Sequence, residues 1–299
     1  MLKLGAMKLY DCHSGYKLPA FRQQKKKYKE IMNGFCPLAS GSKGNCIFLG
    51  TKEAKILIDA GISTRATRNK LASIGVSIEE IDAILITHDH GDHIQGLKVM
   101  AFDMGIPVLA NHETAKGIAA YFEECPKFKI FTTGETFEFR DLEIHPFTIP
   151  HDTLDPVGFS MRYEALKLGF CTDLGFVTSL VREQLKDTDY LYVEANHDPE
   201  LVHASARPPV YKQRVLGKTG HLSNLACAEL LHYISHPGLK KVILGHLSSE
   251  CNTKERALET IRNYLGKHSI DLNLSVALQD TVSEPVYFEL GAEIPLQHC

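Results

Sequence analysis

The chain has 299 residues, 44% of them hydrophobic, so it is long enough to bury a large core and need form only one folded domain. Its 33 basic and 36 acidic residues give a formal net charge of −3, which excludes a strong overall positive field. A nucleic-acid partner would have to be held by local basic patches. The apolar runs fall far short of the roughly 20 residues that span a bilayer, and a signal-peptide core is lacking, so we expect a cytoplasmic protein without membrane contact.

The eight cysteines are scattered and form no Cys-x-x-Cys pair. This spacing is not that of a zinc ribbon or of a thioredoxin-type redox site. Free thiols in a reducing compartment are the expected state.

Residues 1–33 contain few periodic apolar residues and carry the run Lys25-Lys26-Lys27-Tyr28-Lys29. We expect a poorly ordered N-terminal extension over 1–33, with a nucleic-acid-contacting arm as the alternative. A single folded domain is expected over 34–299.

From Phe35 onward the apolar pattern becomes regular and predicts strands at about 46–50 and 55–58. The turn before them contains Ser40, Ser42 and Asn45 among glycines. Its backbone N–H groups could form an anion-binding nest, but a plain hairpin turn explains the composition at least as well. Asp59 follows the strand 55–58, and a helix is predicted over 64–73.

After a predicted strand at 82–86 comes a dense polar cluster, Thr87-His88-Asp89-His90-Gly91-Asp92-His93. Imidazoles and carboxylates crowded in this way must be paired, protonated or metal-bound, and a metal is the economical explanation. The following helix has Ile94, Leu97, Ala101 and Met104 on one face, which places Asp92 near its N-terminus.

The remaining pattern alternates strands with helices. Helices are predicted at 112–123, 176–186, 224–234 and 253–265, and strands at 107–110, 136–139, 142–149, 157–163, 166–171, 190–193, 241–244, 270–276 and 285–289. Segment 207–218 is locally basic and would either grip a nucleic-acid backbone or form a solvated helix face.

Polar side chains repeatedly stand just beyond the end of a predicted strand: Asp59, His88, His151, Asp173 and His246. Residues at strand ends converge on one edge of a sheet, so we expect them to share one site. His88 and His90 are two positions apart in an extended segment and can reach one ion, while Asp92 and His93 point towards a second position. Two metal ions bridged by a carboxylate would activate water for hydrolysis of a phosphodiester or a carbonyl compound.

The motif His88-x-His90-x-Asp92-His93, with Asp59 before it and His151, Asp173 and His246 after it, resembles the metallo-β-lactamase superfamily over about residues 34–290. The resemblance implies an α/β fold, a four-layered αββα sandwich, with a hydrolase site at one edge. It also implies that His88, His90 and His151 hold one metal, that Asp92, His93 and His246 hold the other, and that Asp173 bridges them. Asp59 would orient the cluster from outside. The ligands suit zinc or manganese equally.

Four further motifs are similar to those of the YycJ/VicX-type (WalJ-like) branch, whose members look like 5′ to 3′ DNA exonucleases. They are Ala39-Ser40-Gly41-Ser42-x-Gly44-Asn45, Glu194-Ala195-Asn196-His197-Asp198, Gly220-His221-Leu222-Ser223-Asn224 and Gly245-His246-Leu247-Ser248. The resemblance implies that His246 is the metal ligand and that His221 acts with Asp92 in catalysis, binding the scissile phosphate or protonating the leaving oxygen. Residues expected at the substrate are Ser40, Ser42, Asn45, Asn196, His197 and Ser248, of which Asn196 and His197 fit loop-fixing hydrogen bonds equally well.

Alternative functions are hydrolysis of a small phosphodiester, hydrolysis of a thioester or lactam carbonyl, and non-catalytic metal binding. Asp173 occupies the place where classical β-lactamases of this fold have cysteine, and His221 has no task in carbonyl hydrolysis. The expected partner is therefore a nucleic acid, with DNA favoured, and the expected cofactors are two divalent metal ions.

Overall fold

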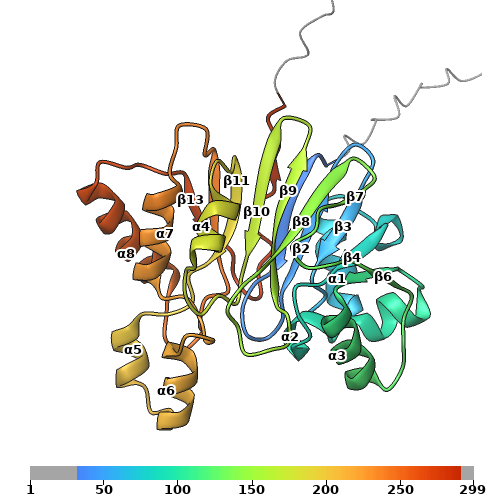
Figure 1. Ribbon diagram of the computed structural model, residues 1–299, viewed down its shortest axis with the longest axis horizontal. Coiled ribbons are helices and arrows are strands. Elements are labelled where there is room, and N and C mark those ends of the chain that lie inside the picture. Colours follow the sequence, from blue (N-terminus) through green and yellow to red (C-terminus); the bar gives the residue numbers. More distant parts are fainter. Residues whose placement is uncertain (1–31, 291–299) are drawn as a thin grey trace, which may run out of the picture. The chain divides into compact units, whose positions relative to one another are not determined.

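Two seven-stranded β-sheets lie face to face in the computed structural model, which describes residues 32–290 (Figure 1). The first sheet has the order β14 (Val286–Tyr287), β1 (Gly34–Ala39), β2 (Cys46–Gly50), β3 (Lys55–Ile58), β4 (Ala83–Leu85), β5 (Val108–Ala110) and β6 (Phe128–Ile130). The second has the order β13 (Leu274–Val276), β12 (Lys241–Gly245), β11 (Tyr190–Glu194), β10 (Leu166–Cys171), β9 (Val157–Tyr163), β8 (Leu142–Thr148) and β7 (Phe137–Phe139).

Alternating side chains along the strands build two kinds of core. On β2, Ile47 and Leu49 point into the space between the sheets, whereas Phe48 points to the outer face of the first sheet. The space between the sheets is filled by aromatic side chains of the second sheet such as Phe159 and Phe170. Because both faces of each sheet are covered, the strands read as nearly continuous apolar runs.

Helices cover the outer face of each sheet (Figure 1). Against the first sheet lie α1 (Thr64–Ser73), α2 (Gly91–Ile94) and α3 (His112–Phe122), which contribute Leu71, Ile94 and Ile118 to its outer core. Against the second lie α4 (Ser179–Leu185), α7 (Asn224–Ile234) and α8 (Lys254–Lys267). These four layers confirm the expected αββα sandwich.

A further helical pair, α5 (Pro199–Ala204) and α6 (Pro209–Leu216), packs together through Val202 and Val215. The sequence pattern did not predict α5, and it left α6 open as one interpretation of the basic segment. Short turns η1 (Ile78–Glu80) and η2 (Lys98–Asp103) complete the helical elements of the described residues. Within that range, no helix has the length and apolar character needed to cross a membrane.

The predicted helix at 94–104 is interrupted. α2 begins at Gly91 and ends at Ile94, and the wider turn η2 follows it. The backbone N–H of Gly96 donates to the Ala60 carbonyl at 2.8 Å instead of continuing the helix. The register consequently shifts, so that Met100 is fully buried while Met104 is only partly buried.

Parallel pairing in one half of each sheet determines where the polar residues meet. Strands β3 to β6 run parallel, and so do β10 to β13. Their carboxyl ends therefore point to the same edge of the sandwich, where ligand-bearing loops of an α/β fold gather. The expectation for residues 1–33 falls almost wholly outside the described range, and the division into domains stays a prediction.

Candidate active site

The predicted ligands come together at one edge of the sandwich, beyond the carboxyl ends of β4, β8, β10 and β12. Potential ligand atoms of His88, His90 and His151 lie within 4.8 Å of one another, and so do those of Asp92, His93 and His246. These two sets coincide with those that the family resemblance implied.

Asp173 stands between the two sets. Its Oδ2 lies 3.3 Å from Nε2 of His93, and its Oδ1 lies 3.7 Å from Nε2 of His151. Oδ1 also lies 3.1 Å from Nδ1 of His246, so the carboxylate of Asp173 contacts histidines of both sets.

Three of the site residues leave their strands in a left-handed backbone conformation. Asp59, Asp173 and His246 follow β3, β10 and β12 with φ of 61°, 57° and 53°. Such angles are uncommon outside glycine and cluster at functional sites, because the surrounding structure must compensate for the strain. Here the abrupt turn brings each side chain into the cluster just beyond its strand.

Outer hydrogen bonds orient the imidazole rings. His93 Nδ1 donates to Asp59 Oδ2 at 2.8 Å, and His246 Nδ1 donates to Glu194 Oε1 at 2.9 Å. Thr87 Oγ1 donates to Asp59 Oδ2 and accepts from His88 Nδ1, each at 2.9 Å. A ring whose Nδ1 carries the hydrogen presents a bare Nε2 to a cation.

The Nε2 atoms of His88 and His246 are buried and have no hydrogen-bond partner within the described range. Buried polar atoms nearly always have a partner, and a buried nitrogen without a protein partner is suited to bind an ion or a water molecule. Together with the nitrogen and oxygen donors around them, these two atoms fit a bound divalent metal ion.

His90 faces the first ligand set with Nδ1 and not with Nε2. Its Nδ1 lies 3.2 Å from His151 Nε2, while its Nε2 lies 3.6 Å from Asp152 Oδ1. His151 is fixed in turn by its Nδ1, which donates to the Gly220 carbonyl at 3.2 Å. Two ring nitrogens that face each other either share a proton or bind a common cation, and the second arrangement completes the first ligand set.

Carboxylates dominate the electrostatics of the cluster. Burial favours neutral imidazole, but attraction to Asp173 and Asp59 outweighs it and raises the pKa of His93 well above its ordinary value. Burial likewise opposes, and Asp173 favours, protonation of His246, whose pKa rises to about 10. Burial would raise the pKa of Asp173, but His246 and His93 hold it well below its ordinary value. Asp173 therefore stays ionised, and the electrostatics of the site favour a bound positive charge.

Glu194 is a functional residue that the sequence reasoning missed, although its motif was noted. Its Oε1 accepts from Nδ1 of His221 at 2.8 Å and from Nδ1 of His246 at 2.9 Å. Its Oε2 accepts from the backbone N–H groups of Leu174 at 2.6 Å and Leu222 at 3.1 Å. The signal was an acidic residue closing the buried apolar strand 190–193. Asp152 was missed as well; it directly follows His151 and accepts from Arg214 Nε at 2.6 Å.

His221 lies beside both ligand sets. Its ring centre is 5.1 Å from that of His246 and 5.4 Å from that of His151. Because Nδ1 is bound to Glu194, Nε2 is the nitrogen left for a substrate. Burial lowers the pKa of His221, but the Glu194 carboxylate outweighs it, so the pKa lies above its ordinary value.

A cavity of about 330 Å³ opens over the cluster. It is lined on the side of the ligand cluster by His90, Asp92, Asp173, His221 and His246. Its other lining residues include Ser42, Asn196 and the loop Ser248–Glu250, which we call the rim. α6 contributes Tyr211 and Arg214, and Arg207 precedes that helix. The site therefore combines candidate metal ligands with cationic and aromatic side chains at its mouth.

The residues expected at the substrate separate into two groups. Ser42, Asn196 and Ser248 line the cavity. Ser40 and Asn45 are 2% and 3% exposed: Ser40 Oγ accepts from the His246 N–H, and Asn45 Nδ2 lies 3.1 Å from His93 Nε2. Their side chains contact the ligand cluster and do not line the cavity, and a contact with substrate stays a prediction for them. His197 is also buried, and its backbone pairs with Ser223.

The loop Ser40–Asn45 is a hairpin turn between β1 and β2, not an anion-binding nest. The N–H groups of Gly41 and Lys43 donate to the side chains of Asn45 and Gln279, both at 2.8 Å. Those of Gly44 and Asn45 donate to backbone carbonyls. Donors engaged in this way cannot bind phosphate.

Comparison with known proteins agrees with this geometry. Residues 54–247 match the family model described as "Beta-lactamase superfamily domain". The chain is 33% identical over 250 residues to Exodeoxyribonuclease YycJ of Bacillus anthracis, covering 83% of this chain and 94% of the relative. It is 36% identical over 256 residues to Exodeoxyribonuclease WalJ of Streptococcus pneumoniae, covering 84% of this chain and 95% of the relative.

Solved structures share the fold. The metallo-β-lactamase fold protein YhfI of Bacillus subtilis has a TM-score of 0.62 at 14% identity, over 84% of this chain and 99% of that one. Human tRNase Z, short form, has a TM-score of 0.57 at 15% identity, over 84% and 98%. The chain therefore belongs to the metallo-β-lactamase superfamily and, within it, to the family of the YycJ and WalJ exodeoxyribonucleases.

Proposed function

We propose that this protein is a metal-dependent phosphodiester hydrolase that acts as a 5′ to 3′ DNA exonuclease. The observation that carries the proposal is that two candidate ligand sets lie on either side of Asp173, with His221 beside them. Glu194 accepts a hydrogen bond from His221 and another from the candidate ligand His246. The names of its relatives support DNA as the substrate. A DNA substrate would place the protein in the cytoplasm.

Two divalent metal ions are the proposed cofactors. His88, His90 and His151 would hold one, and Asp92, His93 and His246 the other, with Asp173 between them. Bound metal ions of this kind supply water activated near neutral pH and neutralise charge that develops on a phosphate. Nitrogen and oxygen donors without sulfur suit zinc and manganese alike.

The charge balance supports two ions in place of one. The carboxylates of Asp59, Asp92, Asp173 and Glu194 surround the histidines, and all but Asp92 are at most 2% exposed. Buried charges are tolerated when they are paired or coordinate metals. Two dications would match this negative charge.

The residues of the chain perform the remaining tasks. His221 would donate a proton from Nε2 to the leaving oxygen, because Glu194 fixes its ring through Nδ1 and favours its charged form. Asn196 keeps the His246 loop in position, since its Nδ2 donates to the His246 carbonyl at 2.7 Å. Asp92 combines a ligand position with direct access to the cavity.

The mouth of the cavity fits a nucleic-acid strand. The Arg207 guanidinium lies 5.1 Å from the ring centre of Tyr211 and pairs with Glu250. Arg214 pairs with Asp152. Guanidinium groups bind phosphate through paired hydrogen bonds, and a neighbouring aromatic ring offers a surface on which a base can stack. We assign the Arg207–Arg214 segment to the grip on the substrate strand.

The test is to incubate metal-loaded protein with end-labelled single- and double-stranded DNA and RNA, with and without a 5′-phosphate. Stepwise release of mononucleotides from the 5′ end of DNA is the expected result, and chelation should abolish it. Activity that survives complete metal removal contradicts the mechanism. Cleavage of a thioester or lactam without cleavage of any phosphodiester contradicts the proposed reaction.

A further inference from the structure

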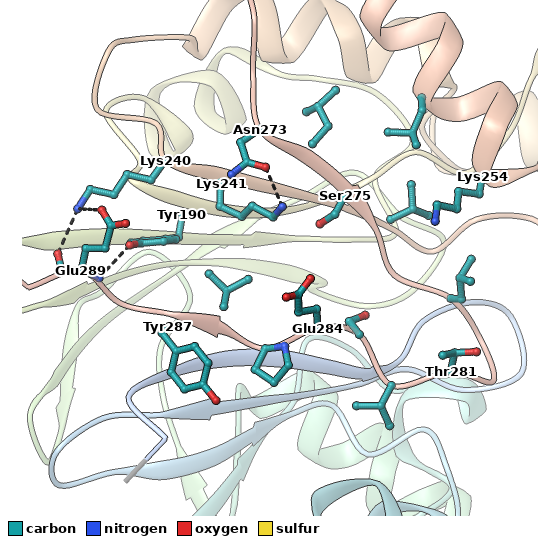
Figure 2. A pocket seen from close by; sticks show the side chains of 18 of the residues that line it. Tyr190, Lys240, Lys241, Lys254, Asn273, Ser275, Thr281, Glu284, Tyr287 and Glu289 are labelled. Atoms are coloured by element: carbon teal, nitrogen blue, oxygen red, sulfur yellow. Dashed lines mark hydrogen bonds and ion pairs between the residues drawn. The ribbon is translucent and has the colours of Figure 1, made fainter. Parts of the chain in front are cut away.

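A second and larger hollow, of about 660 Å³, lies outside the metal-ligand cluster (Figure 2). One wall is α8 together with β12 and β13, and the other is the segment from Leu278 to Glu289, which includes β14. We call this hollow the α8 groove. None of the proposed metal ligands lines it.

Four cations line the α8 groove, and two of them, Lys254 and Arg262, have neither an ion-pair partner nor a side-chain hydrogen bond within the described range. Lys240 pairs with Glu289 at 3.5 Å, and Lys241 donates to Asn273 Oδ1 at 2.9 Å (Figure 2). Lys254 and Arg262 are exposed on α8. They lie eight residues apart on one face of α8, a separation of about 12 Å.

Exposed aromatic and polar groups lie along the same hollow. The Tyr287 side chain is 63% exposed on β14, and Leu278 is 39% exposed on the same wall. Ser275 and Thr281 add hydroxyl groups (Figure 2). A cationic groove with an aromatic platform is how proteins bind single-stranded nucleic acid without sequence preference.

Both walls of the α8 groove begin where the rim of the active-site cavity ends. Lys254 comes directly after the loop 248–253, in which Asn252 Nδ2 donates to the Asn196 carbonyl at 3.0 Å. On the other wall, Gln279 accepts from the Lys43 N–H at 2.8 Å and donates to the Gly44 carbonyl at 2.9 Å. A strand that crosses the rim between Ser42 and Ser248 would reach the Lys254 end of the groove.

We propose that the α8 groove binds single-stranded nucleic acid, namely a stretch of the substrate strand away from the bond being cleaved. Lys254 and Arg262 bind its phosphates, and Tyr287 stacks on a base. A highly acidic peptide or a polyphosphate has no bases to stack on Tyr287, so the aromatic side chain favours a nucleic acid over either of them. This proposal rests on the proposed nuclease function.

The test compares the double variant Lys254→Gln/Arg262→Gln with the matched control Lys127→Gln/Lys267→Gln. The control removes two exposed lysines that lie outside the groove and whose side chains form no ion pair with any residue of the described range. Binding of a fluorescent 30-nucleotide oligothymidine is followed by anisotropy at several salt concentrations. The groove variant should bind about 10-fold more weakly, with a salt slope smaller by about 1.4 for two lost phosphate contacts on a single strand, and the control should bind as the unchanged protein does.

Two further measurements separate this proposal from the proposed function. Turnover of bis(p-nitrophenyl) phosphate, which is too small to reach the groove, should be unchanged in the groove variant. If no form of the protein hydrolyses this ester, the proposed function fails while the binding result still decides the groove. Tyr287→Ala should weaken binding of oligothymidine but not of an abasic strand of equal length.

Three outcomes would overturn the proposal. The groove variant could bind the strand as tightly as the control, or both variants could weaken binding equally, which would indicate a diffuse charge effect. An acidic peptide or inorganic polyphosphate that binds more tightly than DNA, and is lost in the groove variant, would assign the groove to a different ligand.

Discussion

Replacing Glu194 by glutamine removes one negative charge from the centre of the site with almost no change of volume. Oε1 accepts two imidazole N–H groups and Oε2 accepts two backbone N–H groups. An amide nitrogen at the Oε2 position would face the backbone N–H groups of Leu174 and Leu222, which are donors with a fixed direction. The amide nitrogen must therefore take the Oε1 side and donate to Nδ1 of His221 and His246.

That donation reverses the tautomer of His246. Hydrogen then sits on Nε2, the buried atom that has no partner and that we assign to the metal. Loss of an outer partner of a metal-binding histidine typically costs about 10- to 100-fold in metal affinity, which corresponds to about 1.4 to 2.7 kcal/mol. His221 simultaneously loses the carboxylate that favours its charged form.

Metal affinity is measured by competition with a chelating dye, and turnover of bis(p-nitrophenyl) phosphate is measured at saturating metal. Glu194→Gln should show metal affinity reduced about 10- to 100-fold, with turnover still reduced when metal is saturating. Thermal unfolding in chelator shows whether the variant folds. Glu183→Gln, on the exposed face of α4, is the control. A folded Glu194→Gln protein with unchanged affinity and turnover would refute this account of the site.

Four further substitutions probe other parts of the site. His246→Ala should lower the metal content, whereas His221→Ala should keep two metals per chain and lose turnover, as measured by elemental analysis and hydrolysis. Asp59→Asn should keep the fold, because asparagine tolerates φ of 61°, but should weaken metal binding about 10-fold through His93. Gly61→Ala should destabilise the protein by about 3 kcal/mol in denaturant unfolding, because its Cβ would lie 1.6 Å from the Asp92 carbonyl oxygen.

Each of these predictions is contradicted by a specific result. Metal loss in His221→Ala would mean that the two histidines have exchanged roles. Full metal affinity in Asp59→Asn would show that the outer carboxylate does not orient the ring. Gly266→Ala is the control for Gly61→Ala, since nothing lies within 4 Å of the added methyl group, and equal stability losses would exclude the steric explanation.

The sequence by itself determined the fold family and the candidate ligands. The patterns that indicate them are local in the sequence and can be read without knowing how the chain packs. These patterns are the period of the strands, the histidines and aspartates at strand ends, and the spacing from His88 to His93. Residues at strand ends were expected to share one edge of a sheet, so distant ligands such as His151 and His246 could be assigned to one site from the sequence, although β8, which precedes His151, pairs antiparallel with both of its neighbours.

Apolar periodicity predicted helix boundaries less well where a backbone N–H group donates to a carbonyl of a distant segment. The helix after Ile94 was expected to be continuous because its apolar spacing is helical. Gly96 instead donates to Ala60 across the fold, and no periodicity within the helix records that contact.

Only the tertiary structure showed which of the residues expected at a substrate line the cavity and which are buried against the ligand cluster. Ser40 and Asn45 carry the residue types of a substrate loop, but their side chains are buried under His246 and His93. Glu194 was recognisable only as an acidic strand end until His221 and His246, 27 and 52 residues later, met on one of its oxygens. The α8 groove likewise exists only because the edges of two sheets meet beside α8. Hydrogen-bond partners and cavities depend on which segments pack together, and a linear pattern does not specify that.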